Sequence, residues 1–495
     1  MSDAVAARVP IGTKLAYGFG AVAYGIKDNG FSVFLLLFYN QVVGLPADRV
    51  GLAIMIALLV DAFIDPVVGH LSDQTHTRWG RRHPWLYLSA IPIGLVWLLL
   101  WNPPATSPDM QFIYLVGIAI LVRAVVSCYE VPSLALAPEI TRDYHERTVV
   151  LRYRFLFGWA GGLLMLVLAF AALLVPEPGY PVGQLNPNGY HRFAAVGAAI
   201  MLVAVLVSAI GTHRAYARRQ AIAPERLPLV PTFKAIITTL RNRPFLILMG
   251  AAVFAFANQG LTFALSNYLL LFIWEFPQIA FIFYALALFA GVVIAFLSVA
   301  AISKRLGKPM AAATLAITSI IIGTLPYWLR LLDLFPGNES PWLMPAFLTF
   351  AGLSTAAAVS VMILTTSMMA DITEASEFET GKRTEGLFFA GFFFTQKCVT
   401  GIGIFLSGVM LSAIGFPAEA RPGAIDVAVV DRLALAYAAL TISLGLCAAW
   451  AYTKFPFGRA EHEARLARLA VAAPPDSLEK AEISRPAGLA KSDFA

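Results

Sequence analysis

Long apolar stretches recur along the whole chain, and short polar segments separate them. Each stretch is long enough to cross a hydrocarbon core of roughly 30 Å as an α-helix. The sequence therefore predicts an all-α membrane protein. The twelve predicted spans lie at about 12–43, 47–71, 85–101, 109–138, 148–176, 191–213, 244–274, 277–303, 309–332, 342–370, 385–415 and 430–453.

The longest connection is basic, contains proline and divides the predicted spans into six and six. Glu139-Ile140-Thr141 ends the fourth span, and Asp371-Ile372-Thr373 ends the tenth. The number of residues between these two motifs is nearly the same as the number between Ser72, after the second span, and Ser303, after the eighth. This internal similarity predicts a parallel repeat of six helices, with a substrate bound between the halves near the membrane midplane. The predicted organisation is a bundle at 1–213, a cytoplasmic linker at 214–243, a second bundle at 244–454 and a disordered cytoplasmic tail at 455–495.

Composition agrees with this pattern, because 59% of the residues are hydrophobic and 13% are charged, against about 25% charged in soluble domains. The first apolar stretch contains Lys27 and Asp28, which favours a retained span over a secretory signal. Cys128, Cys398 and Cys447 have unrelated spacings, so we interpret them as packing residues rather than a disulfide or metal framework.

Positive charge is distributed unevenly between the two sides of the predicted membrane. Most Lys and Arg residues fall in the N-terminus, the even-numbered connections and the tail, which predicts that both termini are cytoplasmic. This distribution explains the formal charge of +6 without a nucleic-acid partner. Five basic residues fall in the odd-numbered connections: Arg49, Arg192, Arg330, Arg421 and Arg432.

Two acids lie inside the second span. Asp61 and Asp65 are one helical turn apart, so both carboxylates face the same way. An ionised side chain at the bilayer centre costs at least ~2.5 kcal/mol on insertion scales. A bound cation is the first candidate to offset that cost.

The predicted spans contain few other charged residues, and acids outnumber bases by one. If these groups share one cavity, a single Na+ or proton would neutralise the surplus. Ser127 lies one turn from both Arg123 and Glu130 on the same helical face. Carboxylates and a hydroxyl suit a hard cation, so we expect Na+ at Asp61, Asp65 and Ser127. The charged set is Lys27, Asp28, Asp61, Asp65, Arg123, Glu130 and Lys397.

The loop from Gly69 to Pro84 is rich in glycine and arginine, and its counterpart in the second half is the shorter Ser303–Pro309. It is either a topology anchor or a charged hinge that pairs with helix ends in one state and releases them in the other. The predicted gating residues are Asp73, Arg78, Gly80, Arg81 and Arg82.

Several motifs together resemble the glycoside-pentoside-hexuronide cation symporters of the major facilitator superfamily. They are the Lys27-Asp28 pair, DAFIDPVVG in the second span, the later WGRRHP, SCYEVPSLAL in the fourth span, the ERT and YRF that follow it, and the isolated Lys397. The resemblance covers all twelve spans. It implies a cation site at Asp61, Asp65 and Ser127 with Lys397 beside it, and roles in sugar binding for Asp28, Glu130 and Arg154. We also assign Lys27, Tyr24 and Arg123 to the predicted substrate site.

The chain departs from the melibiose permease pattern at positions that concern the substrate. Glu130 replaces an aspartate, Leu134 replaces a sugar-stacking tryptophan, Leu58 replaces an arginine, and Arg123 has no charged equivalent. A loss of stacking disfavours a galactoside, and a relocated arginine favours an anionic substrate such as a hexuronide. Glu130 also keeps the coupling ion open, because a desolvated glutamate could carry a proton in place of Na+.

We therefore expect a major facilitator fold that performs Na+ or H+ coupled symport of a sugar, glycoside or hexuronide. The expected protein is a monomer in a bacterial inner membrane, and it is not an enzyme and needs no cofactor. Vertebrate lysophospholipid symporters share the second-span acids, so a lysolipid or another amphiphile is the first alternative substrate. A receptor that binds without transporting is the alternative from another class.

Overall fold

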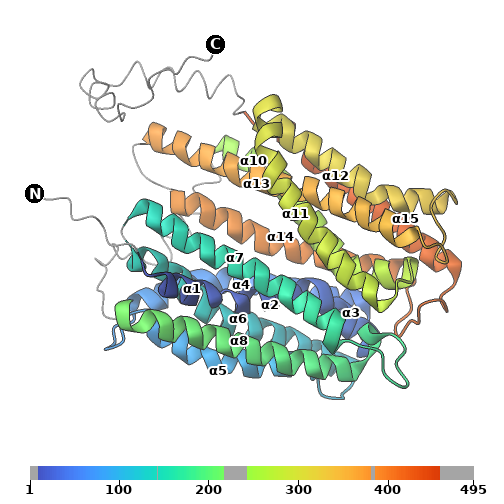
Figure 1. The fold of residues 1–495 in the computed structure, drawn as a ribbon, viewed down its shortest axis with the longest axis horizontal. Helices are drawn as coiled ribbons and strands as arrows, with labels where there is room; N and C mark the ends of the chain where they lie inside the picture. The colour runs from blue at the N-terminus through green and yellow to red at the C-terminus, as the bar shows by residue number, and fades with distance from the viewer. Residues whose placement is uncertain (1–8, 142, 217–241, 381–384, 457–495) are drawn as a thin grey trace, which may run out of the picture.

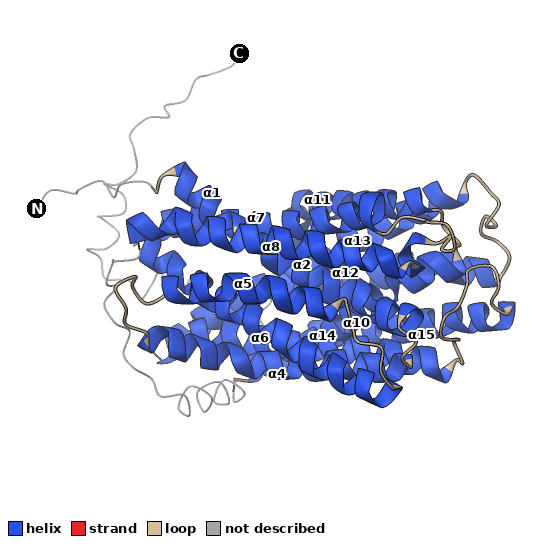
Figure 2. Cartoon of the chain, turned by 90° about the horizontal axis from the view of Figure 1, so that it is seen from below, coloured by secondary structure: helices blue, strands red, loops and turns tan. Residues whose placement is uncertain are grey.

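The computed structural model describes residues 9–141, 143–216, 242–380 and 385–456 (Figure 1). Every regular element in these ranges is helical, and Figure 2 shows the helices running side by side along one axis. Twelve described segments are long and apolar enough to cross a membrane. The predicted all-α membrane fold is confirmed. Most of the predicted linker and tail, at 217–241 and 457–495, lies outside the described residues.

The first span is not a uniform α-helix, since short α-helices alternate with π-helical turns. Its elements are α1 (Ile11–Phe19), α2 (Val22–Asn29), η1 (Gly30–Phe34), α3 (Leu35–Leu37) and η2 (Phe38–Val42). The next five spans are α4 (Ala47–Gln74), α5 (His83–Leu100), α6 (Pro108–Ile140), α7 (Tyr144–Leu168) continued by η3 (Ala169–Leu173), and α8 (Pro187–Tyr216), with the short η4 (Gly183–Leu185) before α8.

The last six spans follow the same plan. They are α10 (Arg243–Tyr268) continued by η5 (Leu269–Ile273), α11 (Gln278–Leu306), α12 (Lys308–Leu331), α13 (Leu343–Thr380), α14 (Glu385–Ala413) and α15 (Val427–Thr453). The prediction ended the tenth span near residue 370, but α13 continues to Thr380. Hydropathy marks where a helix leaves the hydrocarbon, whereas a helix with good internal hydrogen bonds can continue into water.

The internal repeat extends to the backbone at the ends of the first and seventh spans. Both end in a π-helical turn, where Val43 N donates to Phe38 O at 3.0 Å and Trp274 N donates to Leu269 O at 3.2 Å. The next residue in each half has a positive φ, of 87° at Gly44 and 47° at Glu275. The same left-handed turn is therefore built with glycine in one half and with glutamate in the other.

Glu275→Gly should raise the thermal unfolding midpoint of the detergent-solubilised protein by roughly 1 °C. The left-handed conformation costs a residue with a Cβ about 1–2 kcal/mol, which glycine avoids. The greater entropy of glycine in the unfolded chain cancels about half of this gain in stability. Glu275→Ala is the matched control, because it removes the exposed carboxylate but keeps the Cβ. An equal rise in both variants would assign the effect to charge and contradict the backbone explanation.

Helices α1–α8 lie together in Figure 1, and α10–α15 lie together beside them. The two sets meet mainly where α4 packs against α14, α10 against η1, and α11 against α7 and η3. Because twelve spans return the chain to its starting side, Ile11 and Thr453 lie at one end, which we call the terminal end. The opposite end is called the far end.

Hydrogen bonds between described residues of the two sets lie at mid-span or towards the far end. Three of them are Tyr268 Oη to Asn40 Oδ1 at 2.8 Å, Ala420 N to Gln41 Oε1 at 2.7 Å, and Gln278 Nε2 to Leu174 O at 2.7 Å. At the terminal end, ion pairs such as Arg81 with Glu139 and Lys308 with Asp371 stay within one set. The structure therefore corresponds to a state that is closed at the far end.

Candidate functional site

Three helices bring the predicted cation-site residues together in the middle of the spans. The helical turn of α4 puts Asp61 and Asp65 on one face, and that of α6 does the same for Arg123 and Ser127. Lys397 reaches them from α14, across the contact between the two sets. Asp61 is completely buried, with 0% of its side chain exposed.

Every oxygen of Asp61 has a partner. Its Oδ2 accepts from Arg123 Nε at 3.1 Å and lies 3.0 Å from both Arg123 Nη2 and Lys397 Nζ. Its Oδ1 lies 3.0 Å from Ser127 Oγ, which is also 2.8 Å from Asp65 Oδ1. A hydroxyl has one proton, so Ser127 can donate to only one of the two carboxylates at a time. Asp65 Oδ2 pairs with Lys397.

This cluster already contains two bases for its two acids. Arg123, which the sequence analysis assigned to the substrate, contacts Asp61 because it lies one turn from Ser127 on α6. Its guanidinium also lies 5.1 Å from the centre of the Phe31 ring. Within the described residues, no group of three or more His, Cys, Asp or Glu side chains could hold a metal ion. The Na+ site at Asp61, Asp65 and Ser127 stays a prediction.

A second ion pair joins α6 to α7. Arg154 is buried, donates from Nη1 to Ser133 Oγ at 2.8 Å, and its Nη2 lies 3.9 Å from Glu130 Oε1. Arg154 was not counted among the charges inside the predicted spans, although it falls in the fifth apolar stretch. Four acids therefore meet four bases, and the predicted surplus of one negative charge was wrong. Tyr17, which no sequence motif marked, lies with its ring centre 5.9 Å from the Arg154 guanidinium.

The first span contributes a buried base beside an exposed acid. The Lys27 side chain is 2% exposed, and its Nζ lies 4.4 Å from the centre of the Tyr24 ring. Asp28 is exposed, although it lies in the middle of the span. Glu130, Asp65 and Lys397 are 24%, 29% and 21% exposed. These charged groups therefore border a surface that solvent can reach, as a substrate site requires.

Most of the predicted gating residues form one network at the terminal end. Glu139 Oε1 accepts from Arg81 Nη2 at 2.9 Å and from Arg82 Nε at 3.3 Å, and Arg82 also pairs with Asp73. Gly80 forms the turn with a φ of 83°. Arg78 lies apart, with its guanidinium 5.6 Å from the centre of the Trp79 ring.

The second half has a counterpart of this network at its own terminal end. Lys308 at the start of α12 pairs with Asp371 of α13 at 2.6 Å, and Asp371 is the repeat counterpart of Glu139. A role in gating stays a prediction for both networks.

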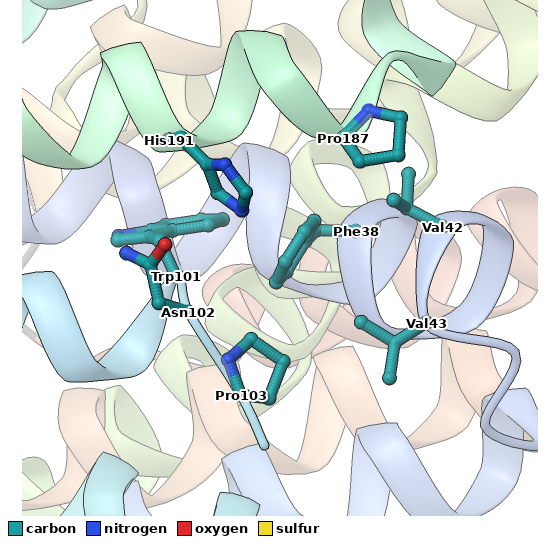
Figure 3. A pocket seen from close by; sticks show the side chains of 8 residues that line it. All are labelled: Phe38, Val42, Val43, Trp101, Asn102, Pro103, Pro187 and His191. Carbon is teal, nitrogen blue, oxygen red and sulfur yellow. The ribbon is translucent and has the colours of Figure 1, made fainter. Parts of the chain in front are cut away.

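A pocket of about 320 Å³ lies apart from these charges, at the far end of the first set of helices (Figure 3). No sequence motif predicted this pocket, and most of the residues that line it are aromatic or aliphatic. Its lining residues are Phe38, Val42, Val43, Trp101, Asn102, Pro103, Pro187 and His191.

Twelve membrane-spanning segments of the described residues, in two sets that meet at a charged mid-span cluster, form the major facilitator fold. The solved inward-open structure of the xylose transporter XylE from Escherichia coli has a similar fold. The similarity covers 90% of this chain and 94% of the XylE chain, with a TM-score of 0.57 and 15% sequence identity. At that identity the likeness concerns the fold alone.

The sequence profile of the MFS/sugar transport protein family matches residues 16–459, so the chain belongs to that family. The protein is therefore a transporter and not an enzyme, and the resemblance to glycoside-pentoside-hexuronide symporters is confirmed. An uncharacterized symporter of Synechocystis is 28% identical, over 85% of this chain and 89% of that protein. A glucuronide carrier protein homolog of Escherichia coli is 26% identical, over 82% and 84%.

Proposed function

We propose that the protein imports a small anionic sugar derivative, such as a hexuronide, together with Na+ or H+ by alternating access. The observation that carries this proposal is the environment of the Lys27 side chain. This lysine is buried at mid-span, and within the described residues it makes no ion pair or hydrogen bond, only the contact with the Tyr24 ring. A buried ammonium without a partner is costly, so a ligand carboxylate is its natural complement.

The neighbours of Lys27 suit the rest of a sugar acid. Asp28 and Glu130 both act electrostatically on Lys27, and both are accessible to solvent. Their carboxylates can accept hydrogen bonds from sugar hydroxyls. Arg154 lies beside Glu130 in a long ion pair of 3.9 Å. The name of the glucuronide carrier relative agrees with an anionic sugar.

The proposed coupling cation binds beside the substrate, at Asp61, Asp65 and Ser127, with Lys397 as their neighbouring base. Asp65 is the more accessible of the two acids. Glu130 is the competing candidate if the ion is a proton, because it is partly exposed and its one ion pair among the described residues is the long contact with Arg154. The positive charges of the even-numbered connections support cytoplasmic termini, and hence a site that opens to the cytoplasm in this state.

Uptake into proteoliposomes of D-glucuronate, D-xylose and lysophosphatidylcholine tests the substrate class, under imposed Na+ and pH gradients in turn. We expect gradient-driven accumulation of glucuronate. Accumulation of xylose alone would favour a neutral sugar, and transport of the lysolipid would favour the amphiphile alternative. Binding of glucuronate without counterflow would identify a receptor.

Lys27→Met should lower the uptake of glucuronate by roughly ten- to a hundredfold, because a charge-assisted hydrogen bond contributes about 1.5–3 kcal/mol. The loss should appear as a higher KM. Lys454→Met is the matched control, since that lysine is exposed at the terminal end of α15. An unchanged KM in folded Lys27→Met would remove the basis for an anionic substrate.

A further inference from the structure

The charged groups at mid-span form one electrostatic network whose charges cancel. Each member interacts with at least one other through an ion pair or at longer range. With every side chain in its ordinary charge state, the unloaded network carries no net charge. The four acids are Asp28, Asp61, Asp65 and Glu130, and the four bases are Lys27, Arg123, Arg154 and Lys397.

Arg123 supplies the positive charge that completes this balance. It is held on Asp61 by two nitrogens and covered on another side by the Phe31 ring, with 3% of its side chain exposed. The guanidinium therefore neutralises the negative charge of Asp61, which a bound cation would otherwise have to neutralise. Without Arg123, the unloaded network would carry one negative charge.

We infer that Arg123 couples the two transported species by charge, so that one monovalent cation and one monoanionic substrate cross together in an electroneutral cycle. This inference rests on the anionic substrate of the proposed function. The unloaded protein is neutral and can change between its two states. With a cation alone it would bury one positive charge, and with the anion alone one negative charge. Only the protein with both bound is neutral again, so partly loaded forms are held back.

The first test needs only the unmodified protein, with D-glucuronate as the probe. In proteoliposomes with a fixed Na+ or pH gradient, a K+ gradient with valinomycin sets the membrane potential. An electroneutral cycle gives the same steady-state accumulation at 0 mV and at −100 mV inside. Movement of one net charge would change the accumulation about fiftyfold. A fiftyfold rise would overturn the inference while leaving transport of the sugar acid intact.

The second test needs no substrate, so it decides the inference even if glucuronate is not transported. Arg123→Met makes the unloaded network negative and the cation-bound network neutral, so the cation-bound form should change state while the unloaded form is held back. In substrate-free proteoliposomes with equal Na+ inside and outside, we expect exchange of ²²Na+ for unlabelled Na+ to rise at least tenfold over the unmodified protein.

Two further variants separate charge from shape. Arg123→Lys keeps the charge, so its ²²Na+ exchange should stay near that of the unmodified protein. Arg152→Met is the matched control, because that arginine is exposed on α7 and belongs to no ion pair of the network. A rate of exchange in Arg123→Lys equal to that in Arg123→Met would assign Arg123 a packing role and overturn the inference. If Arg123→Met does not fold, the potential dependence of the unmodified protein still decides.

Discussion

Lys397→Ala should abolish gradient-driven accumulation and lower the thermal stability of the protein, because it leaves two acids to share one base. Asp61 would still contact Arg123, whereas Asp65 would lose its only ionic partner among the described residues. Breaking a buried pair by removing one partner costs about 3–5 kcal/mol, and partial exposure of Asp65 should place the cost near the lower end.

A double-mutant comparison makes this prediction specific. Adding Asp65→Asn to Lys397→Ala should recover most of the thermal stability, whereas adding Asp61→Asn should recover less, because it leaves both Asp65 and Arg123 unpaired. The coupling between Lys397 and Asp65 should be about 0.5–3 kcal/mol, read from unfolding midpoints in detergent. Lys454→Ala is the control for loss of a lysine at an exposed site. Additive effects of Lys397→Ala and Asp65→Asn would show that the ion pair contributes no stability.

Gly408→Val should drive the protein out of the far-end-closed state. A Cβ on Gly408 of α14 would lie 2.2 Å from Ala47 O of α4, and a backbone oxygen cannot move aside like a flexible side chain. Overpacking of this kind costs about 1–3 kcal/mol, and α4 and α14 can relieve it only by separating at the far end. A cost of that size shifts a two-state equilibrium by roughly five- to a hundredfold, so transport should fall strongly.

Labelling of a buried far-end position measures the shift. Ala420 is 6% exposed in this state, so Ala420→Cys should react slowly with a membrane-impermeant maleimide. In the Gly408→Val background the labelling rate of this cysteine should rise several-fold above its rate with Gly408 in place. Gly250→Val is the matched control, since nothing lies within 4 Å of a Cβ added there. Unchanged labelling in a folded Gly408→Val protein would mean that the contact between α4 and α14 does not control far-end opening.

The two predictions concern the same helix pair at different depths. Lys397 ties α14 to α4 at mid-span by charge, and Gly408 allows the two backbones to approach at the far end. A cation or a substrate that changed the partners of Lys397 would therefore act directly on a contact between the two halves. This geometry links occupancy of the site to the change of state, which alternating access requires.

The sequence by itself determined the features that depend on neighbouring residues. Twelve apolar stretches gave twelve helical spans, because the length needed to cross a hydrocarbon core is a local property. The spacing of Asp61 and Asp65 placed both carboxylates on one helix face for the same reason. The related motifs at Glu139 and Asp371 indicated a repeat, and both residues hold the same kind of terminal-end ion pair. Hydropathy did not find the end of α13, because that helix continues beyond the apolar stretch.

Only the tertiary structure decided which charges meet. Arg123 is assigned to Asp61 by the packing of α6 on α4, and Lys397 reaches Asp65 over 332 residues of sequence by the packing of α14 on α4. Arg154 joins the buried network because α7 turns that side of its helix towards Glu130. The rotation of one helix against another depends on side-chain packing along its entire length. The charged residues could be identified from the sequence. That they form one network with balanced charges followed only from the packing of helices that are distant in the sequence.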